Sequence, residues 1–230
     1  MAEAHLQLGI TQAFYDHDWA AGGRSLERAL VLAPLNANVL YGMAQYALLR
    51  RRFEEAERYS LRALEQDPLS SRAYSQMGNV YRVTGRLAEA ERSYRKALEL
   101  SPQRITAHHL LAIVLLKRGE IDAAIEEAKL EPSQWGRLTA LADAYWKAGR
   151  RAESDAALAE LEAKHAKDSA FQIAAIYAIR GDVDLAFSWI NRGIDQNDAG
   201  MNLLACEVIF EPLHNDPRWL PALRRIGLAD

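Results

Sequence analysis

Residues 74–102 read YSQMGNVYRVTGRLAEAERSYRKALELSP, and this stretch decides the fold. In its first half, apolar and small residues recur every three or four positions, which gives a helix one apolar face. Gly85 ends that helix, because glycine readily takes the left-handed conformation that a short turn requires. Residues 87–100 are rich in strong helix formers and form a second amphipathic helix, which Pro102 ends. The stretch therefore predicts a helical hairpin.

The hairpin is repeated along the chain. Pro34, Pro68 and Pro102 lie 34 residues apart, and each ends one of the similar segments ALVLAP, ALEQDP and ALELSP. A fixed period of this length is typical of a solenoid built from stacked hairpins. We therefore predict an all-α, right-handed superhelix of six units. Their predicted bounds are 3–36, 37–70, 71–104, 105–133, 134–166 and 167–198.

The spacing of the turn glycines is not uniform. Gly85 and Gly119 are 34 residues apart, whereas Gly119 and Gly149 are 30 apart and Gly149 and Gly181 are 32 apart. The shortfall of four residues falls near residues 127–137. We therefore expect the second helix of the fourth unit to be about one turn short, with a local change of curvature.

The repeat pattern ends after Asp198. Residues 201–228 read as two short helices separated at residues 212–217, where two prolines occur. An open solenoid needs a cover for its last apolar face, so we predict that residues 199–230 form capping helices. The apolar residues suited to this role are Leu203, Leu204, Val208, Ile209, Leu213, Trp219 and Leu223.

Composition places the chain among ordinary folded soluble proteins. It has 230 residues, of which 50% are hydrophobic, and a formal net charge of −3, which gives no electrostatic reason to expect nucleic acid or an anionic membrane as partner. Cys206 is the only cysteine, so no intrachain disulfide can form. The uncharged run at residues 29–49 contains Pro34, which favours two helices and a turn over a membrane span. The first residues lack the pattern of a signal peptide, which suits a cytoplasmic protein, but the compartment stays open.

The hairpin pattern resembles that of the tetratricopeptide repeat. The matching residues of the third unit are Tyr74, Met77, Gly78, Tyr81, Ala90, Tyr94 and Pro102. More narrowly, residues 15–34, 181–198 and 210–228 resemble the C-terminal repeat region of bacterial signalling proteins with winged-helix, nucleotide cyclase or kinase domains. The chain is then either a free-standing relative or a piece of a longer protein. In the second case a periplasmic location is also open.

The resemblance implies a binding groove on the concave face, lined by the first helix of each unit. The predicted groove residues are Tyr41, Gln45, Arg72, Asn79, Arg82, His109, Lys117, Asp143, Trp146 and Lys147. Asn79 could pair with a peptide backbone, while Arg72 and Arg82 would favour an acidic partner. Tyr41 and Trp146 could be aromatic anchors. The alternative is that these residues are simply the solvated faces of helices.

Other motifs have plain structural interpretations. His108 and His109 are adjacent and point about 100° apart on a helix, so they cannot share a metal ion. Asp18 suits an N-cap, Gly22 occupies a small-residue packing position, and Cys206 suits the core. No nucleophile, base or phosphate loop is recognisable, so we expect no enzyme activity, cofactor or metal.

Two functions remain open. The first is a non-catalytic scaffold that binds a peptide or protein segment in the concave groove. The second is a regulatory, sensory or self-association module of a larger bacterial signalling protein, in which homo-oligomers could form.

Overall fold

The structure is a computed structural model that describes residues 1–229. Over these residues the chain forms thirteen α-helices and two 3-10 helices and contains no β-strand. The first twelve α-helices pack as six hairpins. The hairpins are α1 (Ala2–Phe14) with α2 (Trp19–Leu32), α3 (Ala37–Leu49) with α4 (Phe53–Gln66), α5 (Ser71–Val83) with α6 (Leu87–Leu100), α7 (Ala107–Lys117) with α8 (Ile121–Lys129), α9 (Gln134–Lys147) with α10 (Arg151–His165), and α11 (Ala170–Arg180) with α12 (Val183–Asp195). The prediction of an all-helical right-handed solenoid is confirmed.

Each hairpin turns at a residue with a left-handed backbone. Gly85 and its three later counterparts have φ between 74° and 83°, and a Cβ on any of them would meet nothing within 4 Å. Glycine is therefore needed there for its backbone freedom, not for lack of space. In the first two units the same position is held by His17 (φ 56°) and Arg51 (φ 58°). A left-handed conformation costs such residues about 1–2 kcal/mol, so the tertiary fold must hold these two turns.

Small residues let the two helices of a hairpin approach closely. A Cβ on Gly78 of α5 would lie 2.6 Å from the ring of Tyr94 on α6. Tyr94 is fully buried, and its hydroxyl donates a hydrogen bond of 2.7 Å to Asn79 Oδ1. In the first hairpin, a Cβ on Gly22 of α2 would lie 2.6 Å from the Cβ of Ala13 on α1. Asp18 caps α2 by accepting a hydrogen bond from the Ala21 amide, as the sequence predicts.

The fourth unit is irregular. Helix α8 has nine residues, where the other second helices have 13–15, which agrees with the shortfall in glycine spacing. The turn before α7 places its N-cap residue, Thr106, at φ 73°, and the Thr106 side chain forms no capping hydrogen bond. Glu131, which is fully buried, caps α7 instead by accepting hydrogen bonds from the amides of Thr106 and His109. This capping residue was not identified from the sequence.

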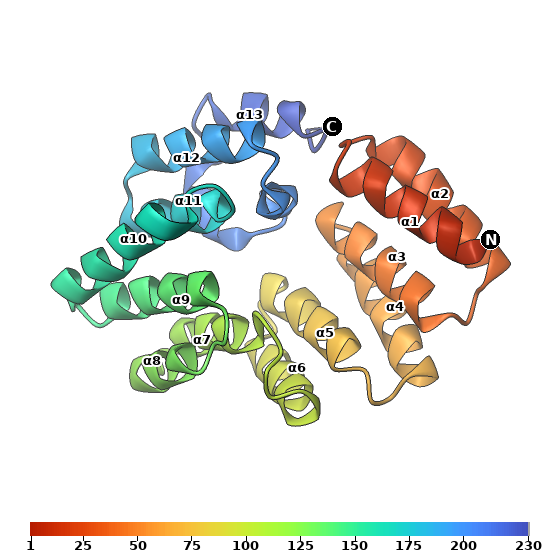
Figure 1. Cartoon of the computed structure of the whole chain (residues 1–230), viewed down its shortest axis with the longest axis horizontal. Coiled ribbons are helices and arrows are strands. Elements are labelled where there is room, and N and C mark those ends of the chain that lie inside the picture. Colours follow the sequence, from red (N-terminus) through yellow and green to blue (C-terminus); the bar gives the residue numbers. More distant parts are fainter. Residues whose placement is uncertain (230) are drawn as a thin grey trace.

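The hairpins follow an arc that brings the C-terminal residues beside the first hairpin (Figure 1). After α12 come the 3-10 helices η1 (Ala199–Leu203) and η2 (Val208–Leu213) and the short helix α13 (Trp219–Arg225). The sequence predicts only two short helices here, whereas the structure has three. One reason is that Pro212 lies inside η2, where its ring favours a short, tight turn over a longer α-helix.

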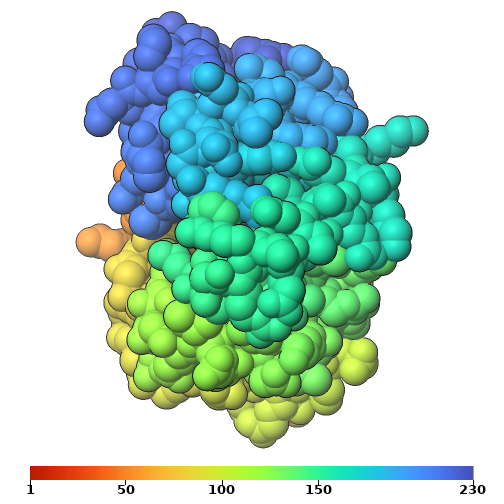
Figure 2. Space-filling model, turned by 90° about the vertical axis from the view of Figure 1, so that its left-hand side faces the viewer, coloured from red at the N-terminus to blue at the C-terminus, as the bar shows by residue number. Residues whose placement is uncertain are grey.

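The C-terminal segment, residues 199–229, joins the two ends of the solenoid, and we call it the tail. Phe210, Leu213 and Trp219 pack in one buried cluster with Phe187 and Ile190 of α12, and the same cluster includes residues of α1, α2 and α3. Figure 2 shows the deep-blue C-terminal residues lying directly against the sixth unit.

Hydrogen bonds add to this closure. The indole N–H of Trp19 donates to the Ile226 carbonyl at 2.7 Å, and the amide of Asn202 donates to the Phe14 carbonyl at 2.9 Å. The arc is therefore closed by contacts between residues about two hundred positions apart in the chain.

Candidate functional site on the concave face

Three cavities lie along the concave face. Their volumes are about 380, 230 and 710 Å³, and we name them the N-terminal, central and outer cavities. The N-terminal cavity lies between α1, α3, α5 and η1. The central cavity lies mainly between α5, α7, α9, α11 and the tail, and the outer cavity between α7, α9, α11 and η2. Their lining residues belong to the first helices of the hairpins, to positions adjoining those helices, or to residues 199–212.

The tail crosses the concave face at a buried ion pair. Arg82 of α5 and Glu207, between η1 and η2, form a bidentate ion pair, with Arg82 Nη1 at 2.7 Å from Glu207 Oε2. Burial opposes ionisation of Glu207, but the charge and hydrogen bonds of Arg82 outweigh it and lower the pKa of the carboxyl. Arg82, a predicted groove residue, is therefore already paired within the chain.

Four predicted residues line the N-terminal cavity together: Tyr41, Gln45, Arg72 and Asn79. The Arg72 guanidinium lies 3.6 Å from the centre of the Tyr41 ring, so these two side chains stack on one another. Asn79 lines the central cavity as well, and its carbonyl oxygen already accepts the Tyr94 hydroxyl.

Buried polar groups line the central cavity. His109 and Asp143 are 6% and 4% exposed, and neither His109 Nδ1 nor Asp143 Oδ1 has a hydrogen-bond partner. Burial lowers the pKa of His109 to about 4 and raises the pKa of Asp143 to about 7, the latter although Arg180 and Lys147 favour the carboxylate. Burial thus works against charge on both side chains.

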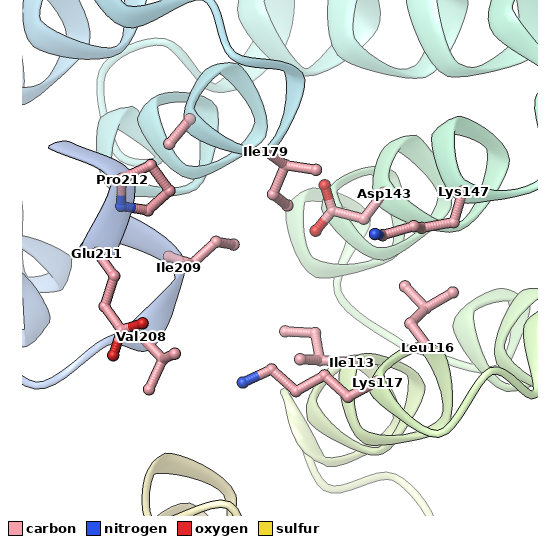
Figure 3. Close-up of a pocket in the computed structure, with 11 residues that line it drawn as sticks. Ile113, Leu116, Lys117, Asp143, Lys147, Ile179, Val208, Ile209, Glu211 and Pro212 are labelled. Carbon is pink, nitrogen blue, oxygen red and sulfur yellow. The ribbon is translucent and has the colours of Figure 1, made fainter.

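The outer cavity combines apolar walls with two lysines. Ile113, Leu116 and Ile179 supply apolar surface, and Lys117 and Lys147 lie on one side, as Figure 3 shows. Burial and the nearby charge of Arg82 disfavour the ammonium of Lys117 and lower its pKa, although Glu207 and Glu211, the latter in the same lining, act in the opposite direction. Asp143 lines this cavity as well as the central one.

Trp146 does not line any of the three cavities. Its ring is covered instead by the guanidinium groups of Arg151, at 3.2 Å, and Arg180, at 4.8 Å. The other nine predicted groove residues line a cavity, and their role in binding a partner stays a prediction.

The tail residues that complete the site were not identified from the sequence. Leu203, Glu207 and Ile209 come from a segment that we predicted only as a cap. One signal was present, because Glu207 is the sole charged residue in the apolar run 199–210. A lone acid in such a run is buried only when it has a partner.

Comparison with known proteins identifies the family. A family profile described as "Tetratricopeptide repeat" matches residues 10–71 and 139–201, and a second profile with the same description matches residues 69–129. The chain belongs to the tetratricopeptide repeat family. A search of curated proteins found no match.

Several solved structures, tetratricopeptide repeat proteins among them, are similar to the chain. One is TTC0263 from Thermus thermophilus, which is 21% identical, with a TM-score of 0.65 over 84% of this chain and 98% of that one. Another is PilW, described as a type IV pilus biogenesis factor, with 20% identity and a TM-score of 0.64 over 84% and 92% of the chains. A third is YrrB, described as having an unusual peptide-binding site, with 21% identity and a TM-score of 0.50 over 78% and 96%. At these identities the likeness shows the fold alone.

Two other features are absent from residues 1–229. Within that range no three His, Cys, Asp or Glu side chains come together as a metal site would need. None of the helices described has the length and apolar character needed to span a bilayer. Cys206 is buried, and burial raises the pKa of its thiol, so it is a core residue.

Proposed function

We propose that this tetratricopeptide repeat protein is a non-catalytic scaffold that binds a segment of a protein partner at its concave face. Repeat solenoids commonly use such extended concave surfaces for binding. The single observation that carries the proposal is the outer cavity, which the tail leaves open and which has a volume of about 710 Å³. That volume lies within the range of about 300–1,000 Å³ usual for ligand pockets.

The lining of the outer cavity suggests the chemistry of the partner. Its apolar walls would bury a bulky apolar side chain, and Lys117 and Lys147 would pair with a carboxylate beside it. Arg82 is neutralised by Glu207, so we assign the attraction for acidic groups to the two lysines instead. The proposed ligand is thus a segment with an acidic residue, or a chain end, next to a large apolar residue.

A displayed library of random peptides tests this proposal. Peptides selected on the intact chain should combine acidic and large apolar residues. The double variant Lys117→Ala/Lys147→Ala should bind them about 10- to 100-fold more weakly, which corresponds to about 1–3 kcal/mol. The matched control is Arg95→Ala on α6, whose side chain pairs with Glu91 and lines none of the three cavities. Equal affinity for the lysine double variant and the parent would refute the assignment.

The resemblance to the repeat regions of bacterial signalling proteins stays a prediction. Under that alternative the chain would regulate a winged-helix, cyclase or kinase domain, or associate with itself. The gene sequence on both sides of the region that encodes this chain decides between the alternatives, because an adjoining effector domain would favour regulation. Sedimentation at several concentrations tests for homo-oligomers.

A further inference from the structure

The central cavity contains unpaired hydrogen-bond acceptors. Asp143 Oδ1 and Gln172 Oε1 are both buried and neither has a hydrogen-bond partner, and His109 Nδ1 and Arg82 Nε are two further unpaired atoms in the same lining. Leaving one such group unsatisfied costs about 1–3 kcal/mol, so four around one cavity are unusual unless something binds there. They come from four different first helices, α5, α7, α9 and α11.

The rest of the lining is mostly apolar. Ile113, Trp135 and Phe171 contribute large side chains, and the Trp135 ring meets the His109 ring edge-on with centroids 6.0 Å apart. The volume of about 230 Å³ lies below the range of about 300–1,000 Å³ for drug-sized ligands. The cavity therefore suits a small molecule with an apolar body and one polar end.

The charges in the lining indicate the sign of that polar end. Arg82 and Glu207 neutralise one another, and Arg180, which adjoins the lining, pairs with Asp155 at 2.8 Å. Lys147 is the other cation whose charge reaches Asp143. Within residues 1–229, no hydrogen bond or ion pair reaches Asp143 Oδ1, although its side chain is buried. Such a group gains most from a donor that also carries positive charge.

We propose that the central cavity binds a small organic amine. Its ammonium group would donate hydrogen bonds to Asp143 and Gln172, and its apolar body would lie against Trp135 and Ile113. This site goes beyond the proposed binding of a protein segment, because the amine occupies the inner cavity while the segment occupies the outer one. Asp143 lines both cavities, so the two functions could influence one another.

The binding should depend on pH. Burial raises the pKa of Asp143 to about 7, and the amine requires the ionised carboxylate. The other titratable or charged groups that line the two cavities are Arg82 of α5, His109 and Lys117 of α7, Lys147 of α9, and Glu207 and Glu211 of the tail. Arg180 of α11 lies outside both linings, but its charge also acts on Asp143. Of the lining groups, His109 is already neutral above pH 5, because burial lowers its pKa to about 4. Affinity for the amine should therefore rise between pH 6 and pH 8.

Isothermal titration with three probes of one size tests the proposal: 2-phenylethylamine, 2-phenylethanol and phenylacetate. We expect the amine to bind the intact chain with a Kd of about 0.1 mM or tighter. The alcohol should bind at least ten-fold more weakly, and the acid should not bind measurably. Equal binding of all three probes, or no binding of the amine at 10 mM, would overturn the proposal.

Variants locate the site and separate it from the outer cavity. Asp143→Asn keeps the shape of the side chain and should weaken amine binding at least ten-fold, as should Ala175→Leu, which fills the cavity. The control is Asp122→Asn, an exposed acid on α8, which should bind like the parent. The single variant Lys117→Ala leaves Lys147 in place beside Asp143, so it should keep its amine affinity while its peptide affinity falls. Unchanged amine binding by Asp143→Asn would contradict the proposal and leave the peptide function standing.

Discussion

The buried pair between Arg82 and Glu207 should be essential to the fold. Glu207→Ala removes one partner and leaves the Arg82 guanidinium buried, with a side chain that is 5% exposed. Its Nε has no hydrogen-bond partner even in the intact protein. Breaking a buried pair in this way costs about 3–5 kcal/mol. In a chain of this length each kcal/mol lowers the melting temperature by about 2–4 °C, so a fall of about 6–20 °C is expected.

Urea unfolding at pH 7 measures this loss, and two controls identify its origin. Replacing both partners by apolar residues of similar volume, as in Arg82→Met/Glu207→Leu, should restore most of the stability. Glu153→Ala breaks an exposed pair with Arg150 and should cost less than about 1 kcal/mol. The contribution of Glu207 also has a pH signature. Because its pKa is lowered on folding, the contribution is present above the ordinary value of about 4.3 and is lost as the pH falls through the folded value.

Two results would refute the reasoning on this pair. A loss below about 1 kcal/mol for Glu207→Ala would mean that Arg82 is solvated once its partner is gone. An apolar double replacement as unstable as the single variant would mean that packing of the Glu207 side chain, and not charge, holds the tail in place.

Four single substitutions test other parts of the structure. Ionising Asp143 destabilises the fold because its pKa is raised to about 7, so Asp143→Asn should add up to about 4 kcal/mol to the unfolding free energy at pH 8 and little at pH 4, measured in urea. Gly227→Ala should cost well over 1 kcal/mol, since its φ is 66° and a Cβ would lie 2.8 Å from a backbone oxygen. Gly85→Ala, with open space around it, should cost only about 1 kcal/mol in thermal unfolding. Trp19→Phe loses the hydrogen bond to Ile226 and should speed proteolysis of the C-terminal residues, with a stability loss of about 1–3 kcal/mol.

The fold could be predicted because its determinants are local and repeated. The period set by Pro34, Pro68 and Pro102 fixes the hairpins, and the glycine spacing gives the short helix α8. The concave positions follow from the same register, which is why nine of the ten predicted residues line a cavity. Trp146 is the exception, since two arginines cover its ring. Whether any of these residues binds a partner stays a prediction.

The remaining features depend on contacts between distant parts of the chain. Arg82 and Glu207 are 125 positions apart, and the tail has no repeat that would place it across the concave face. Glu131 caps a helix 22 residues before it, again without a sequence pattern that signals the contact. Such pairings are settled only when the curvature of the whole solenoid is known, because that curvature brings the tail to the first and third units.

Hydrogen exchange of the tail amides tests most directly whether the tail packs across the concave face. Residues 204–213 form few regular helical hydrogen bonds, yet the amides of Leu204, Glu207 and Phe210 each donate to a backbone carbonyl inside the packed tail. We predict that peptides covering this segment exchange as slowly as those of α11, and that Glu207→Ala speeds exchange in the tail and in the turn before Trp19 together. Complete exchange of residues 204–213 within seconds in the intact chain would show that the tail is not seated there.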